Sequence, residues 1–110
     1  MQNSQLIFRA IADPTRRAII GMLANGEMTI GDVANRFEVS RPAIAKHLGI
    51  LRDGGLVSVR ESGRERVHKL EPMALKPVED WLDHFSHFWD EKLGKLKAAI
   101  ENPDLDKSET

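Results

Sequence analysis

Apolar residues recur along this chain with two different periods, and these periods predict most of its secondary structure. Between residues 4 and 53 they return every three or four positions, which predicts four short amphipathic helices. Residues 56–70 alternate apolar and polar side chains around Ser62-Gly63, which predicts a two-stranded hairpin. The helical period then returns from about residue 76 to 102. We therefore expect a mainly α chain with a small β-hairpin, in the order four helices, two strands and a fifth helix.

The stretch from residue 29 to 57 organises the rest, because it predicts two helices joined by a tight turn. Thr29 can cap the first helix and Ser40 the second, while Pro42 fits the first turn of the second helix. Gly54 follows the end of that helix. Its inward apolar stripe consists of Ile44, Leu48 and Leu51.

The outward residues of the second helix are small or basic. They are Arg41, Ala43, Ala45 and Lys46, with no acidic residue before Asp53. Small side chains let a helix backbone approach the major groove, while Arg and Lys reach base edges or phosphates. The pattern therefore favours a DNA-reading helix over an ordinary solvated helical hairpin.

The predicted hairpin carries Arg60, Arg64 and Arg66 at its tip and along its arms. A two-stranded arm that follows a helix-turn-helix can lay such residues along the phosphate backbone or into the minor groove. The alternative is a plain solvated hairpin whose exposed edges carry charge.

The charge distribution agrees with a local nucleic-acid surface, although the whole chain has a net charge of −1. Residues 29–70 carry eight Lys and Arg against five Asp and Glu, whereas residues 71–110 carry five Lys against ten acidic residues. The net positive charge is thus concentrated in the predicted reading unit. The acidic C-terminal part is expected to face another partner.

The last predicted helix has an apolar stripe along its whole length, formed by Val78, Leu82, Phe85, Trp89, Leu93, Leu96 and Ile100. Trp81 and Phe88 widen this face beyond what one small domain easily covers. We expect it to mediate dimerisation by packing against its symmetry mate and the first helix. Some of these side chains must also serve the intramolecular core.

Three ordered segments resemble the ArsR-type winged helix-turn-helix repressors: DPTRRAII, SRPAIAKHLGILRDGGLV and VRESGRERVHKL. The resemblance covers roughly residues 5–100. The later segment WLDHFSHFWDEKLGKL is similar to a metal-independent branch of that family with an aromatic-rich last helix. The resemblance implies a homodimer made by the first and last helices, with the fourth helix reading DNA and the wing touching the flanking backbone.

The resemblance also implies which residues contact DNA and which form the dimer. The reading positions are Ser40, Arg41, Pro42, Ala43, Ala45, Lys46 and His47, with Arg64 and Arg66 on the wing. Relatives often have hydroxyl residues at positions 43 and 45, so alanine there favours contact with a thymine methyl group. The implied dimer positions are Leu6, Ile7, Leu82, Phe85, Trp89, Leu93 and Leu96.

No cofactor is predicted. The chain has no cysteine, which excludes disulfides, thiolate metal sites and cysteine catalysis. Asp80, His84, His87 and Glu91 would share one face of a continuous helix and are the only candidate metal ligands. Histidines beside an aromatic stripe are more often packed or solvated. A small apolar ligand between dimer helices is a further alternative, lined by Trp81, Phe85, Phe88 and Trp89.

We predict a homodimeric, cytoplasmic transcriptional repressor that binds a partly palindromic double-stranded operator and contacts no membrane. Residues 1–102 would form a single domain that includes dimerisation helices at about 4–12 and 76–102, and residues 103–110 a flexible tail. No catalytic constellation is present, so an enzyme is not expected. The alternatives are a protein-interaction module that never reads DNA, or a repressor that responds to a metal or small ligand.

Overall fold

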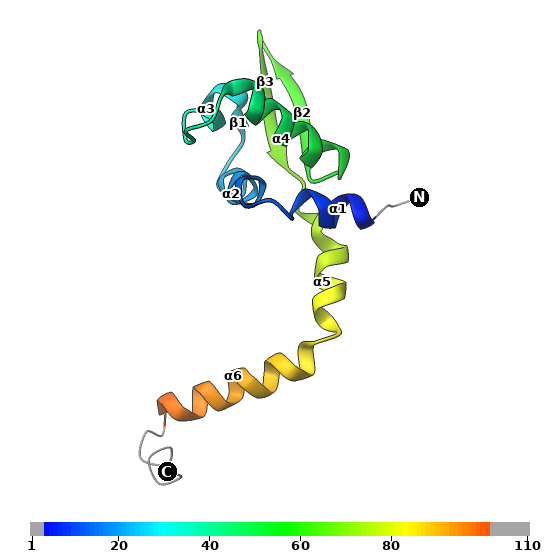
Figure 1. The fold of residues 1–110 in the computed structure, drawn as a ribbon, viewed down its shortest axis with the longest axis vertical. Coiled ribbons are helices and arrows are strands. Elements are labelled where there is room, and N and C mark those ends of the chain that lie inside the picture. The colour runs from blue at the N-terminus through cyan, green and yellow to red at the C-terminus, as the bar shows by residue number, and fades with distance from the viewer. Residues whose placement is uncertain (1–3, 102–110) are drawn as a thin grey trace. The chain divides into compact units, whose positions relative to one another are not determined.

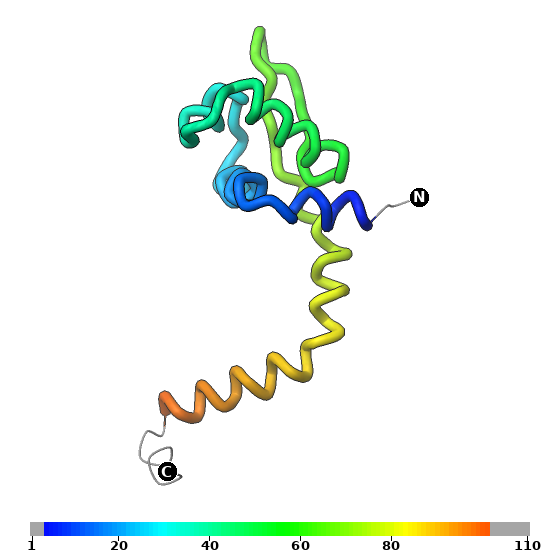
Figure 2. The backbone as a smooth tube through the Cα atoms, in the orientation of Figure 1, coloured from blue at the N-terminus to red at the C-terminus, as the bar shows by residue number. Residues whose placement is uncertain are grey.

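The computed structural model describes residues 4–101, which divide after Val78 into two units. Figure 1 and the backbone trace in Figure 2 show the path of the chain. The elements are α1 (Ser4–Ala10), α2 (Pro14–Leu23), β1 (Met28–Thr29), α3 (Ile30–Ala34), α4 (Arg41–Asp53), β2 (Val57–Ser62), β3 (Glu65–Leu70), the 3₁₀ helix η1 (Pro72–Leu75), α5 (Lys76–Asp83) and α6 (Ser86–Glu101). The predicted flexible tail at 103–110 lies outside the described residues.

Side-chain caps fix where three of the helices begin. The Asp13 carboxylate accepts a hydrogen bond from the Arg16 backbone N–H at 3.0 Å and starts α2. Thr29 and Asp32 form a reciprocal capping box at the start of α3. Ser40 accepts from the Ala43 N–H at 3.3 Å and starts α4. Each cap satisfies a backbone donor that a helix terminus leaves without an internal partner.

The predicted hairpin forms, and a third strand joins it. The antiparallel sheet has the order β1-β3-β2, because Met28 and Thr29 pair with His68 and Val67 of β3. A strand of only two residues is too short to show an alternating pattern, so the sequence alone does not predict it. Ser62 pairs with Glu65, which moves the turn to Gly63-Arg64, one residue later than predicted.

One apolar core holds the N-terminal unit together. The predicted α4 stripe is buried. Residues from α1, α2, α3 and the start of the wing, which is the hairpin of β2 and β3, surround it. The fully or almost fully buried residues are Ile7, Ala10, Ile19, Leu23, Val33, Ile44, Leu48, Leu51, Leu56 and Val57. Fully burying a large aliphatic side chain contributes about 1.5–3 kcal/mol to folding, so this core supplies the main driving force.

Ile7 corrects one sequence-based expectation. It was expected at the dimer interface, but its side chain is 0% exposed within the chain's own core. Its neighbour Leu6 is 38% exposed and stays available on the surface of α1. A seven-residue helix has one inward face, and the i, i+3 pair Ile7 and Ala10 occupies it.

The prediction of one uninterrupted helix from residue 76 to 102 is wrong, because α5 ends at Asp83 and α6 begins at Ser86. At the break, His84 and Phe85 donate their backbone N–H groups to carbonyls three residues back, at 3.2 and 2.9 Å. The His84 side-chain nitrogen lies 3.0 Å from the Asp80 carbonyl oxygen, which a continuing helix would use for the His84 N–H. His, Phe and Ser are also weaker helix formers than the residues that follow.

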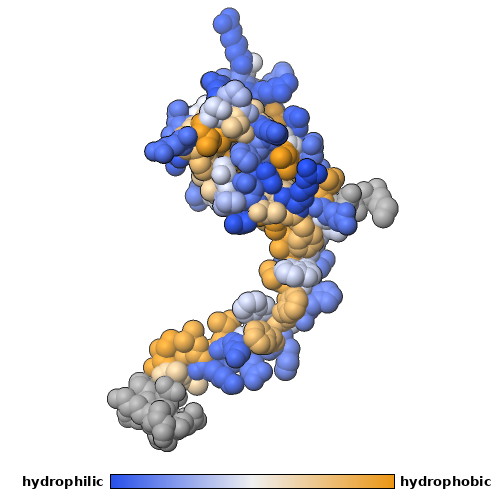
Figure 3. Space-filling view, in the orientation of Figure 1, coloured by the Kyte–Doolittle hydropathy of each residue, from blue (hydrophilic) through white to orange (hydrophobic). Residues whose placement is uncertain are grey.

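The second unit exposes its large apolar side chains. Those of α5, α6 and the break between them are between 42% and 69% exposed: Trp81, Leu82, Phe85, Phe88, Trp89, Leu93, Leu96 and Ile100. Figure 3 shows hydrophobic residues along both helices. Such a run of large apolar side chains is typical of a surface that meets a partner.

Candidate nucleic-acid interface

The N-terminal half of α4 presents the predicted reading positions to solvent. Ser40, Arg41, Pro42, Ala45 and Lys46 are exposed and Ala43 is half-buried. Pro42 lies in the first turn, where its missing N–H costs no hydrogen bond. The remaining N–H groups and the helix dipole of this terminus favour a nearby anion, so the local geometry suits a phosphate group.

A groove joins this terminus to the wing. It encloses about 400 Å³, and Arg41, Arg64 and Arg66 line it together with Asp32 and Glu65. A Cβ atom at Gly31 would lie 3.9 Å from both terminal nitrogens of Arg41, so the Arg41 guanidinium lies over the start of α3. The structure therefore brings Arg41 of α4 next to two wing arginines, Arg64 and Arg66, that lie more than 20 residues later in the sequence.

The strand register divides the wing arginines between the two faces of the sheet. Side chains alternate along a strand, so Arg66 shares a face with His68, which is buried against the core. Arg60 pairs across the ladder with Val67 and lies on the opposite face. There its guanidinium contacts the Glu27 carboxylate at 2.5 Å. This contact raises the pKa of Arg60 and lowers the pKa of Glu27.

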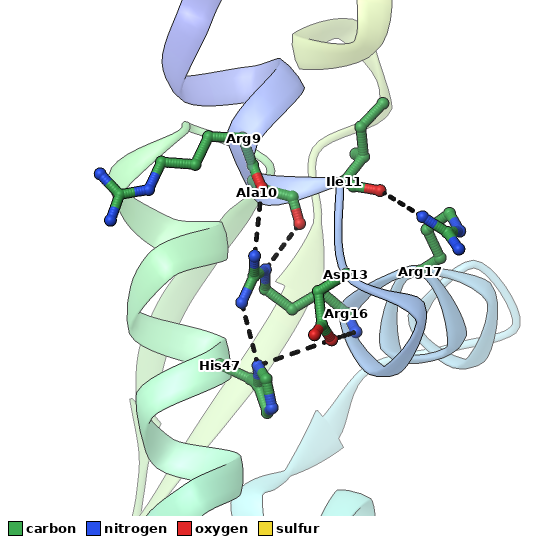
Figure 4. A network of polar contacts seen from close by, with 7 residues as sticks. All are labelled: Arg9, Ala10, Ile11, Asp13, Arg16, Arg17 and His47. Carbon is green, nitrogen blue, oxygen red and sulfur yellow. Dashed lines mark hydrogen bonds and ion pairs between the residues drawn. The ribbon is translucent and has the colours of Figure 1, made fainter.

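His47, a predicted reading residue, lies half-buried beside the start of α2. Its Nδ1 atom is 3.2 Å from the Arg16 guanidinium and 3.9 Å from the Asp13 carboxylate (Figure 4). The Arg16 backbone N–H holds the pKa of Asp13 below its usual value. The Arg16 guanidinium binds backbone carbonyls and His47. The sequence signal for this network is the DPTR segment, residues 13–16, which contains both Asp13 and Arg16.

His68 is a buried histidine in the middle of the sheet. Its side chain is 7% exposed, and its Nδ1 atom has no hydrogen-bond partner among the described residues. Burial lowers the pKa of His68, the nearby charges of Arg52 and Arg66 lower it further, and a hydrogen bond with the Met28 backbone opposes them. The imidazole is therefore held in its neutral form.

The break between α5 and α6 separates the candidate metal ligands into two pairs. Asp80 lies on α5 and His84 directly after it, whereas His87 and Glu91 belong to α6. The spacing that would align all four on one helical face is therefore interrupted. Among the described residues, the one group with ligand atoms in mutual reach is Glu79, Asp80 and Asp83, which contains no histidine. Three exposed carboxylates alone are common without an ion.

Comparison with known proteins identifies the family. Residues 11–60 match the model of a helix-turn-helix domain. The chain is 37% identical over 87 residues to the transcriptional repressor SdpR of Bacillus subtilis, covering 79% of this chain and 97% of that protein. It is 42% identical to the HTH-type transcriptional regulator Rv2034 of Mycobacterium tuberculosis, over 71% of this chain and 73% of the relative.

Solved structures agree with these relatives. The crystal structure of the ArsR family transcriptional regulator RHA00566 superposes with a TM-score of 0.70 at 36% identity, covering 78% of this chain and 94% of that one. The protein belongs to the ArsR family of winged helix-turn-helix proteins and is a DNA-binding transcriptional regulator. None of the helices in the described part of the chain is long and apolar enough to cross a membrane.

Proposed function

We propose that this regulator is a homodimeric, cytoplasmic repressor that binds a partly palindromic operator, in the first instance that of its own operon. The observation that carries sequence-specific reading is the exposed, acid-free face of α4 beside the arginine-lined groove. Repression is supported by the relatives that are named repressors. The protein has no catalytic role in this proposal.

The division of labour on DNA follows from what each side chain can reach. Arg41 and its small neighbours Ala43 and Ala45 would face base edges, because an arginine can donate two hydrogen bonds to guanine. Lys46, Arg64 and Arg66 would contact phosphates and supply affinity without sequence choice. Two-fold symmetry would place the two reading helices about 34 Å apart in successive major grooves.

The second copy of the chain is the proposed partner of the apolar residues on α5 and α6. Leu82 on α5, Phe85 in the break and Trp89, Leu93 and Leu96 on α6 all present large hydrophobic side chains to solvent. Leu6 is the exposed large apolar residue of α1, and we propose that it also contacts the second copy. An isologous contact buries the same patch of both copies.

Selection of DNA from a random duplex library by the native protein and by Arg41→Ala tests this function. We expect the native protein to select a two-fold symmetric site. Arg41→Ala should relax the choice at one base position in each half-site, at a cost of about 1–3 kcal/mol. Arg36→Ala is the matched control, because Arg36 is exposed but does not line the groove.

Three results would count against the proposal. An unchanged preference in Arg41→Ala would remove Arg41 from the reading positions. Failure of the native protein to select any sequence would favour the alternative of a protein-interaction module. Zinc-dependent release of DNA would instead favour the metal-responsive alternative through Asp80, His84, His87 and Glu91.

A further inference from the structure

Arg16 contacts both α1 and α4, two helices that are not adjacent in the sequence. Its Nε atom donates to the Ala10 carbonyl at 2.7 Å, and its Nη2 atom donates to the Arg9 carbonyl at 3.1 Å. Both carbonyls belong to the last turn of α1, where a positive charge is favourable. The Nη1 atom lies 3.2 Å from Nδ1 of His47, in the middle of α4 (Figure 4). Arg16 thus holds the end of α1 and the side of α4 at once.

The contact with His47 is directional. A guanidinium offers only hydrogen-bond donors, so the His47 Nδ1 atom must act as the acceptor. Acceptance at Nδ1 corresponds to the tautomer that carries its proton on Nε2. The Asp13 carboxylate, 3.9 Å from the same nitrogen, completes the polar surroundings of the ring. We call this arrangement of Arg16 and His47 the clamp.

The other contacts of α4 include a second point of attachment to α1. A Cβ atom at Gly54 would lie 3.2 Å from the Leu6 carbonyl oxygen and 3.5 Å from the Ala10 Cβ. The backbones of α1 and α4 therefore approach closely at the C-terminal end of α4. The buried apolar stripe of α4 is not directional, so hydrophobic burial alone permits small rotations of the helix. The clamp supplies the directional contact in the middle of the helix.

We propose that Arg16 and His47 are positioning residues, which set the rotation of α4 about its own axis and hence the sequence specificity of the regulator. This inference rests on the proposed reading of DNA by α4. His47 directly follows Lys46 and lies two positions after Ala45, so a rotation at His47 moves the exposed reading face. Base contacts depend on that geometry, whereas attraction to phosphates tolerates small displacements.

The test measures specific and non-specific binding separately. The duplex selected by the native protein and a scrambled duplex of equal length are titrated by fluorescence anisotropy at several salt concentrations. His47→Leu removes the acceptor, and we expect it to lower the specific-to-non-specific affinity ratio roughly tenfold, because the lost hydrogen bond involves a charged donor. Non-specific affinity and the salt dependence should be unchanged. His47→Gln, whose amide oxygen can accept from Arg16, should restore much of the ratio.

Arg16→Gln should lower the affinity ratio as His47→Leu does, and the double variant should be no worse than either single one. The control is Arg17→Gln. Arg17 donates to the Ile11 carbonyl at 2.8 Å but has no hydrogen bond or ion pair with α4 among those found in the described chain. Thermal unfolding of each variant shows whether it is folded at the assay temperature.

Distinct results would overturn the clamp. An unchanged ratio in folded His47→Leu contradicts it. So does a smaller salt dependence in Arg16→Gln, which would identify Arg16 as a phosphate ligand. Failure of His47→Gln to exceed His47→Leu would assign the effect to packing. If the native protein selects no sequence at all, the reading role of α4 fails, and the clamp fails with it.

Discussion

At the scale of single residues, the buried His68 makes stability depend on pH. Burial keeps the folded-state pKa of this histidine below its ordinary value of 6.5. Between the folded and unfolded pKa values, the unfolded chain therefore binds more protons than the folded one. Stability from this residue is complete above about pH 7 and is lost as the pH falls through the folded-state pKa.

We expect the free energy of unfolding to decrease as the pH falls below the ordinary histidine pKa of 6.5, and the variant His68→Gln to flatten that dependence. Urea denaturation followed by circular dichroism at several pH values measures it. Val59→Ala is the control, because Val59 is the cross-strand partner of His68 and does not titrate. It should lower stability at every pH without changing the slope. A steep acid dependence in His68→Gln would show that another group controls this range.

At the scale of elements, we expect the two faces of the wing to have different roles on DNA. Arg66 lines the groove beside α4, whereas Arg60 is held by Glu27 on the other face. We expect Arg66→Gln to reduce the slope of log affinity against log salt by about one for each protomer, because one phosphate contact is lost. Arg60→Gln, the matched control, should change the slope much less.

Salt titrations with a non-specific duplex compare these two variants directly. Equal changes in slope would mean that Arg60 leaves Glu27 to bind phosphate. If the slope is unchanged in both variants, neither Arg66 nor Arg60 contacts DNA phosphates. The removal of Arg64 by Arg64→Gln extends the series to the tip of the hairpin, where the turn exposes that side chain.

Most elements could be predicted from the sequence because their signals are local. Asp13, Thr29 and Ser40 act within three residues of themselves, and the α4 stripe follows from the helical period. The two-residue strand β1 could not be predicted in this way, because only its pairing with β3 defines it. The break at His84 was concealed by an apolar spacing that continues across it.

In the candidate site, too, local features could be predicted from the sequence and long-range contacts could not. Exposure of Arg41 and Lys46 follows from their position on the face opposite the apolar stripe. The positions of His47 and Arg60 depend on partners 31 and 33 residues away in sequence, namely Arg16 and Glu27. Periodicity places a residue on a face of its own element, but it does not identify the charged group opposite. The long-range polar partners could therefore be identified only from the structure.

At the scale of the whole molecule, the exposed apolar residues of α5 and α6 support the proposed assembly of two chains. Trp89 is 48% exposed, and Leu93, Leu96 and Ile100 follow it at helical spacing. Tryptophan is often the anchor of a protein interface, and truncating such an anchor costs about 2 kcal/mol or more. We expect Trp89→Ala to weaken the dimer roughly thirtyfold.

Sedimentation equilibrium over a range of concentrations measures this dissociation directly. Lys95→Ala is the control, because Lys95 pairs with Glu91 at 3.6 Å on the polar side of α6 and should leave the dimer unchanged. A palindromic operator couples the two equilibria: binding of both half-sites requires the dimer, so Trp89→Ala should also make operator binding steeper in protein concentration. A native protein that stays monomeric, or a variant dimer as tight as the native one, would contradict the proposed interface. If Trp89→Ala dimerises weakly but still binds a single half-site as the native protein does, the dimer interface and the DNA-reading residues of α4 are independent of each other.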